Sequence, residues 1–257
     1  MKVVILAGGF GTRLSEETVI KPKPMVEIGH KPILWHIMKY YSHYGFNEFV
    51  IALGYKAEFV KDYFLNYQKL DSDLFIDFSS KEIKQKKLNN EKWKIHLIDT
   101  GINTLTGGRI NRLRSLIDKE TFLLTYGDGV SDVNIKELIK FHKKQKDSIV
   151  TLTAVHPPAR FGGIKFSHNR VKSFAEKSQV EEGWINGGFM VVEPEIFNYI
   201  NNDQNIFESD VLESVAKNNE LTAYKHNGFW QCMDALRDKY LLDSLWKKNE
   251  APWRVWK

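Results

Sequence analysis

The stretch that decides the fold lies near the N-terminus, where residues 3–14 read VVILAGGFGTRL. The apolar run Val3–Ala7 is rich in β-branched residues and predicts a buried strand. A glycine-rich turn follows it directly. Because glycines let the backbone approach an anion and take up positive φ, the amides of residues 8–11 can converge on phosphate oxygens. The segment therefore predicts an α/β protein with a phosphate site at the end of its first strand.

Arg13 and Leu14 separate this loop from two better-known phosphate loops. The P-loop needs Gly-Lys-Ser/Thr after four intervening residues, and the dinucleotide fingerprint needs a third glycine where this chain has Leu14. A strand-to-helix turn without a ligand is the remaining alternative, but a fixed cation directly after the glycines is hard to explain by turn geometry. The guanidinium of Arg13 instead suits bidentate contact with phosphate.

A second cationic segment, residues 21–25, reads KPKPM. Each proline biases the residue before it away from the α region, so we expect an extended, stiff segment with Lys21 and Lys23 on the same side. In isolation an exposed basic turn would explain this pattern equally well. Next to the glycine loop, the two lysines indicate more positive charge at the same anion, which would then be a polyphosphate.

Strand-like and helical patterns alternate along the rest of the chain and predict a Rossmann-like, mostly parallel mixed sheet flanked by helices. The expected strands are residues 3–7, 48–53, 94–98, 122–125 and 149–155, and the expected helices are residues 33–41 behind Pro32, 57–67, 134–144 and 238–249. The second half predicts a small antiparallel elaboration from residues 163–166, 171–174 and 185–192, then a helix at 208–217 and a strand at 221–226. The polar residues 69–92 are expected to form a long loop or flap.

Composition excludes several classes of protein. Of the 257 residues, 42% are hydrophobic and 27% are charged, which excludes disordered, collagenous and coiled-coil chains and favours one large domain. Without a long apolar stretch, we expect a protein that is neither exported nor bound to a membrane. Cys232, the only cysteine, rules out an internal disulfide and favours the cytoplasm. The 37 Lys and Arg against 32 Asp and Glu suit anionic partners, but no nucleic-acid-binding signature accompanies them, so we expect no nucleic acid partner.

Asp128 is the first candidate for a metal ligand. It stands between two glycines directly after an apolar strand, at the edge where ligands of open α/β sheets bind. A carboxylate beside a polyphosphate is suited to hold Mg²⁺. A turn former or helix cap is the alternative explanation for an Asp in this position.

These motifs resemble the signature of the sugar-phosphate nucleotidyltransferases, carried by residues 8–14 with Lys23 and Pro24. Residues 15–18, 21–29 and 32–39 are similar to the glucose-1-phosphate cytidylyltransferase branch of that family, and the similarity continues at residues 99–101, 106–109, 125–130, 184–189, 229–231 and 251–253. The resemblance implies the nucleotidyltransferase fold in a single domain over residues 1–257, with a nucleotide-binding half at 1–130, a sugar-phosphate-binding half at 131–240 and a C-terminal tail at 241–257.

The same resemblance implies an activity. A cytidylyl group would pass from CTP to α-D-glucose 1-phosphate, giving CDP-glucose and pyrophosphate for deoxysugar and surface-polysaccharide synthesis, such as that of lipopolysaccharide O-antigen. Such a transfer needs no covalent enzyme intermediate, but it needs a hard cation, placed Lys and Arg groups and in-line geometry. The cation expected is Mg²⁺, and the partners expected are the two substrates and further copies of the chain in a trimer or hexamer.

The resemblance also implies roles for individual residues. Lys23, Arg13 and Asp128 would be catalytic, and Asp128 and Asp234 would hold the metal. The nucleotide would contact Leu6, Ala7, Gly8, Gly9, Gly11, Thr12, Arg13, Lys23, Thr106, Gly107, Gly108 and Arg109, with Arg109 reaching phosphates bound to a neighbouring subunit. The sugar phosphate would contact Glu176, Lys177, Asn186 and Gly187.

Departures from the family pattern keep alternatives open. Ser178 stands where the family usually has proline, and residues 206–212 depart from its Trp-Glu-x-x-Pro-Leu pattern. Another sugar 1-phosphate or another nucleoside triphosphate therefore remains an alternative, and a non-catalytic nucleotide-sugar-binding module is a second one. An NAD-dependent oxidoreductase is disfavoured by Leu14, and Cys232 is expected to be a small buried residue rather than a reactive one.

Overall fold

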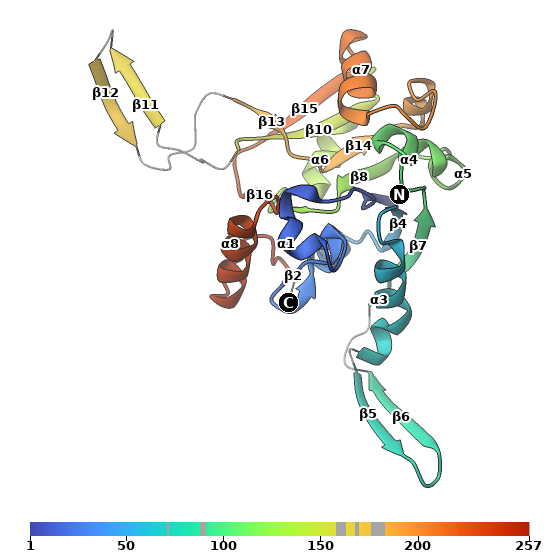
Figure 1. Cartoon of the computed structure of the whole chain (residues 1–257). Helices are drawn as coiled ribbons and strands as arrows, with labels where there is room; N and C mark the ends of the chain where they lie inside the picture. The colour runs from blue at the N-terminus through green and yellow to red at the C-terminus, as the bar shows by residue number, and fades with distance from the viewer. Residues whose placement is uncertain (71, 88–90, 158–162, 168–169, 176–182, 257) are drawn as a thin grey trace.

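One mixed sheet forms the centre of the molecule (Figure 1). The computed structural model describes residues 1–70, 72–87, 91–157, 163–167, 170–175 and 183–256. Within these residues the sheet has eight strands, β1 (Val3–Leu6), β4 (Glu48–Leu53), β7 (Lys94–Asp99), β8 (Phe122–Tyr126), β10 (Val150–Val155), β13 (Ile185–Asn186), β14 (Met190–Val192) and β15 (Leu221–His226).

The order and direction of the strands confirm the expected mostly parallel sheet. β1 lies between β4 and β8 and is parallel to both, β7 extends the sheet beyond β4, and β15 is parallel to β10. β14 joins the two halves by running antiparallel to both β8 and β10, and β13 pairs antiparallel with the end of β10. The expected antiparallel elaboration is confirmed by these strands and by the pair β11 (Gly163–Ser167) and β12 (Arg170–Ala175).

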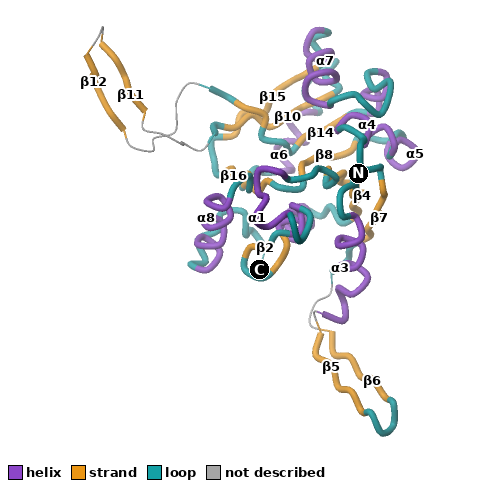
Figure 2. Tube along the Cα trace, in the orientation of Figure 1, coloured by secondary structure: helices purple, strands orange, loops and turns teal. Residues whose placement is uncertain are grey.

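Helices cover both faces of the sheet (Figure 2). Val3 and Ile5 of β1 belong to a buried cluster with α2 (Ile33–His43), α3 (Ala57–Leu70) and α6 (Ile135–His142). The alternate residues Val4 and Leu6 face a second cluster, because successive strand residues point to opposite faces. That cluster contains α4 (Thr106–Arg112), α5 (Arg114–Ile117), a 3₁₀ turn at Pro194–Asn198, a π-helical segment at Phe207–Leu212 and α7 (Glu213–Lys217).

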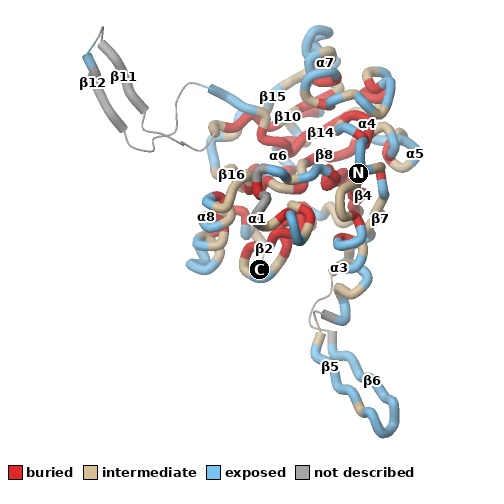
Figure 3. Tube along the Cα trace, in the orientation of Figure 1, coloured by how far each residue is buried: buried red, intermediate tan, exposed pale blue. Residues whose placement is uncertain are grey.

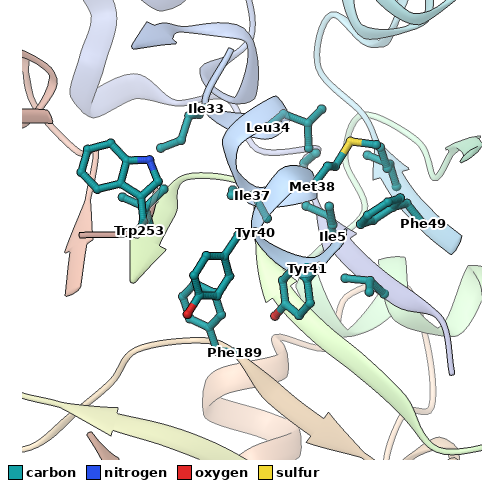
Figure 4. Close-up of a cluster of buried hydrophobic side chains, with 14 of the residues drawn as sticks. Ile5, Ile33, Leu34, Ile37, Met38, Tyr40, Tyr41, Phe49, Phe189 and Trp253 are labelled. Carbon is teal, nitrogen blue, oxygen red and sulfur yellow. The ribbon is translucent and has the colours of Figure 1, made fainter. Parts of the chain in front are cut away.

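Helix α2 confirms its predicted apolar face. Pro32 directly precedes the helix in an extended conformation, as its missing amide allows. The side chains that follow at helical spacing are fully buried in one cluster with Ile5, Phe49 and Trp253 (Figure 4), and they include Ile33, Leu34, Ile37, Met38 and Tyr41.

The C-terminal tail packs on the same helix through aromatic side chains. Trp253, which follows α8 (Leu236–Lys247), is fully buried. Its indole nitrogen donates to Nδ1 of His36 at 3.3 Å, and Nε2 of His36 lies 2.8 Å from the carbonyl oxygen of Ile28. Because Nδ1 accepts, Nε2 carries the proton and donates to the carbonyl. His36 is therefore a neutral packing residue and not a metal ligand.

Several elements differ from the sequence prediction. Part of the segment expected to be a loop is a hairpin of β5 (Ser72–Asp77) and β6 (Glu82–Lys87), which projects from the body and is exposed (Figure 3). The expected extended lysine segment is wrong at Lys23, which begins a 3₁₀ turn over Lys23–Met25. The expected helix at 208–217 begins as the π-helical segment instead. None of the helices in the described part of the chain is long and apolar enough to cross a membrane.

Acid pH is expected to destabilise the tail through His36. Burial lowers the pKa of His36 from 6.5 to about 4. Between these two pH values the unfolded chain binds a proton at His36 that the folded chain does not bind. The free energy of unfolding is therefore highest above pH 6.5 and decreases by about 3 kcal/mol as the pH falls towards 4. Urea unfolding measured across this range should show a steeper loss for the wild type than for His36→Gln, which keeps a donor and an acceptor. Equal losses of stability in the two proteins would contradict the assignment of this pH dependence to His36.

Candidate active site

A cavity of about 560 Å³ lies at the carboxyl ends of β1 and β8. This is the edge at which parallel α/β sheets bind their ligands. The residues of the sequence prediction that line it are Leu6, Ala7, Gly8, Gly9, Gly11, Thr12, Lys23, Thr106, Arg109 and Asp128. The structure therefore brings most of the expected nucleotide-binding residues to one place.

The glycines of the loop serve different purposes. A Cβ atom on Gly8 would lie 2.4 Å from the Arg109 guanidinium, so the close approach of that side chain requires glycine there. Gly11 has φ +66°, which other residues rarely adopt. No atom within 4 Å would meet a Cβ on Gly9, so its backbone faces open space. All three glycines line the cavity, so the structure places the loop where the sequence predicts a phosphate site.

Arg109 fastens the loop to the neighbouring strand ends. It is 5% exposed, and its guanidinium donates to the carbonyl oxygens of Gly8 at 3.0 Å, Leu53 at 3.0 Å and Gly101 at 2.7 Å. It also donates to Thr100 Oγ1 at 2.7 Å. These contacts hold Arg109 within the chain and place its buried positive charge at the cavity wall. Its expected contact with phosphates bound to a neighbouring subunit stays a prediction.

Lys23, Asp128 and Asp234 meet at the side of the cavity. The ammonium nitrogen of Lys23 donates to Asp128 Oδ2 at 2.6 Å and to Asp234 Oδ1 at 2.5 Å. Burial lowers the pKa of Lys23, but the two carboxylates raise it, and the pKa lies above its ordinary value. Lys21 does not join them, because its ammonium pairs with Glu27 at 3.0 Å. The expectation that Lys21 and Lys23 serve the same anion is wrong.

A short antiparallel ladder brings the two aspartates together. β9 (Gly129–Ser131) pairs with β16 (Trp230–Cys232), and Cys232 is opposite Gly129. The amide of Met233 then donates to the carbonyl oxygen of Asp128 at 2.8 Å. Sequence patterns gave no sign of either strand, so only the family resemblance pointed to Asp234. Burial raises the pKa of Cys232 to about 12, which agrees with an unreactive thiol.

The carboxylate of Asp238 holds the turn that carries Asp234. Its Oδ2 accepts from the amides of Asp234 at 3.0 Å and Ala235 at 2.9 Å at the start of α8. The side chain is 11% exposed, so these amides are capped away from most water. Asp238 therefore positions Asp234 without lining the cavity.

The paired carboxylates fit a divalent cation. Both are hard oxygen donors, and together they already hold one cation, the ammonium of Lys23. Among the residues that the structure describes, no group of three or more His, Cys, Asp and Glu side chains could hold a metal. A metal ion would therefore need phosphate oxygens and water to complete its shell.

Glu208 joins the nucleotide side of the cavity to the predicted sugar side, which sequence reasoning missed. Its carboxylate accepts from Tyr126 at 2.6 Å and from Thr106 Oγ1 at 2.8 Å. Asn186 donates to the Tyr126 hydroxyl at 3.3 Å, so this predicted sugar-binding residue lies directly behind the cavity wall. The one feature of the sequence that pointed to the segment carrying Glu208 was that residues 206–212 depart from the family pattern.

The remaining predicted residues fall outside the cavity lining or outside the described part of the chain. Gly187 accepts from the indole of Trp230 at 2.7 Å. Gly107 and Gly108 lie against the backbone of residues 203–205, where a Cβ on Gly108 would come within 2.4 Å of Asp203. Glu176 and Lys177 lie outside the described residues, and so does the side chain of Arg13.

A glycine loop after the first strand, a lysine between two aspartates and a cavity at the sheet edge define an α/β nucleotide-binding protein. The family described as Nucleotidyl transferase matches residues 2–251, and this chain belongs to it. The predicted membership is confirmed. Nucleotidyltransferases of this family act on a nucleoside triphosphate and a sugar phosphate and generally need a divalent metal ion.

Known relatives are similar over the whole chain. The glucose-1-phosphate cytidylyltransferase of Salmonella typhi is 49% identical over 257 residues, covering 100% of both chains. The probable glucose-1-phosphate cytidylyltransferase of Bacillus subtilis is 44% identical over the same lengths. Among solved structures, HddC from Yersinia pseudotuberculosis complexed with GMP-PN has a TM-score of 0.67 at 26% identity, covering 95% of this chain and 99% of that one.

Removal of the Asp238 cap should destabilise the protein measurably. Asp238→Ala leaves two partly buried amides without an acceptor, so we expect the free energy of unfolding to fall by about 1 kcal/mol. Asp238→Asn keeps an acceptor and should recover most of that loss. Urea denaturation followed by circular dichroism measures both variants. If the Asn variant were as unstable as the Ala variant, the charge and not the capping would matter.

Proposed function

We propose that this chain transfers the cytidylyl group of CTP to α-D-glucose 1-phosphate and releases CDP-glucose and pyrophosphate. The observation that carries the proposal is the convergence of Lys23, Asp128 and Asp234 beside the glycine loop. Full-length relatives with this activity in their names, at 49% and 44% identity, support the choice of CTP and glucose 1-phosphate.

The reaction is a displacement at phosphorus. A phosphate oxygen of glucose 1-phosphate attacks the α-phosphorus of CTP, and the bond to the pyrophosphate oxygen breaks. The amides of residues 8–11 and Arg13 bind the triphosphate, and the buried charge of Arg109 adds positive potential at the wall. Lys23 stabilises the charge that develops at the α-phosphate. The sugar phosphate is held by Glu176, Lys177, Asn186 and Gly187.

The metal ion proposed for the site is Mg²⁺, held by Asp128 and Asp234. It would neutralise charge on the two phosphates that must approach each other. The chain's own residues then need only position the substrates, so no side chain has to form a covalent intermediate.

Substrate choice and catalysis are tested together by pyrophosphate release. CTP, UTP, dTTP and GTP are each paired with a panel of sugar 1-phosphates, and CTP with glucose 1-phosphate should give the highest kcat/KM. Lys23→Met and Asp128→Asn should each lose about 10²- to 10³-fold in turnover, because a preorganised charge is removed. Lys21→Met, which removes a lysine paired with Glu27, is the matched control.

The outcomes separate the alternatives. If the enzyme preferred another nucleotide or sugar 1-phosphate, the proposed reaction class would stand and only the proposed substrates would change. If no pair of nucleoside triphosphate and sugar 1-phosphate released pyrophosphate, the result would support a non-catalytic nucleotide-sugar-binding module. Near-normal turnover of Lys23→Met would remove Lys23 from the mechanism.

We also propose that the protein is a cytoplasmic homo-oligomer, a trimer or hexamer. The projecting hairpin supports assembly, because Leu74, Ile76 and Ile83 share one of its faces and are 46%, 48% and 68% exposed. Exposed apolar faces of this kind are typical of interfaces. Light scattering after size exclusion should give a mass of three or six chains, and Ile76→Lys with Ile83→Lys should lower it. A monomeric wild type would overturn this proposal.

A further inference from the structure

The ammonium group of Lys23 occupies the space between the two carboxylates that the proposed function assigns to the metal. Exposed fractions are low, at 13% for Lys23, 30% for Asp128 and 17% for Asp234. Water therefore screens the two negative charges weakly, and they need a cation between them to offset their repulsion. In the protein without ligands, Lys23 is that cation.

The side chain of Lys23 also lies beside the glycine loop. A Cβ atom on Gly11 would lie 3.1 Å from the Lys23 Cβ, and Lys23 lines the cavity together with Gly8 and Gly9. Because the lysine stem is long and flexible, the ammonium can change partners while the backbone stays in place. A triphosphate on the glycine loop would give it a second set of anionic partners.

We propose that Lys23 is a resident counter-ion that a divalent cation must displace, so that the cation and the nucleoside triphosphate bind cooperatively. This inference rests on the proposed function, which assigns Asp128 and Asp234 to the metal. In the nucleotide-free protein the cation competes with the ammonium group. When the triphosphate binds, the ammonium group moves to phosphate oxygens and the carboxylates become available to the cation.

Thermodynamic linkage makes this coupling reciprocal. If the triphosphate raises the affinity for the cation by some factor, the cation raises the affinity for the triphosphate by the same factor. The part of this factor that is due to Lys23 must disappear when its charge is removed, whereas direct contact between cation and phosphate remains. Lys23 therefore has a role in binding order that is separable from its role in the reaction.

The test is Mn²⁺ binding to the nucleotide-free protein, measured by electron paramagnetic resonance. Lys23→Met should bind Mn²⁺ more tightly than the wild type, by about 5- to 150-fold as is typical of coupled sites. Lys21→Met should bind as the wild type does. A non-hydrolysable CTP analogue should then tighten Mn²⁺ binding less in Lys23→Met than in the wild type. Thermal melting gives a second readout, since Mn²⁺ should raise the melting temperature of Lys23→Met more than that of the wild type.

The outcomes distinguish failure of this inference from failure of the proposed function. If Lys23→Met binds Mn²⁺ no more tightly than the wild type, Lys23 does not compete with the cation and the inference is overturned. If Lys23→Met does not fold, Lys23→Gln, which keeps a donor without the charge, is measured instead with the same criterion. If Asp128→Asn and Asp234→Asn leave Mn²⁺ binding in the presence of the analogue unchanged, the metal site itself is wrong.

Discussion

The contact of one ammonium group with two carboxylates is the interaction on which the site depends. Lys23 follows the glycine loop, Asp128 ends the turn after β8, and Asp234 precedes α8, so one contact joins three distant segments at the mouth of the cavity. Two weakly exposed carboxylates side by side would repel each other, and the lysine removes that cost. The same charges suit a triphosphate and a divalent cation, so the group that stabilises the empty site is also equipped to receive its ligands.

Two cations, the buried Arg109 and the partly buried Lys23, have different tasks around the cavity. Arg109 is fixed by hydrogen bonds to carbonyl oxygens of Gly8, Leu53 and Gly101, so it holds the glycine loop against the chain at the ends of β4 and β7. Lys23 instead contacts the carboxylates of Asp128 and Asp234 through a long, flexible stem. The guanidinium therefore maintains the shape of the site, while we propose that the ammonium group changes partners when ligands bind.

The sequence predicted the features that depend on local patterns. The strand at Val3–Ala7 and the apolar face of α2 could be predicted because buried positions are occupied by apolar residues at a regular spacing. The ladder of β9 and β16 was not, because strands of three residues carry too little periodicity. The inward position of Arg109 was missed for a related reason. An arginine whose partners are mainly backbone carbonyl oxygens leaves no acidic residue in the sequence to reveal them.

The most direct measurement is a crystal structure of the protein with Mn²⁺ and a non-hydrolysable CTP analogue, with anomalous scattering used to locate the metal. The account predicts a metal peak between Asp128 and Asp234, phosphates along residues 8–11, and Lys23 turned from the aspartates to a phosphate oxygen. A nucleotide bound elsewhere, or a metal away from these carboxylates, would contradict it.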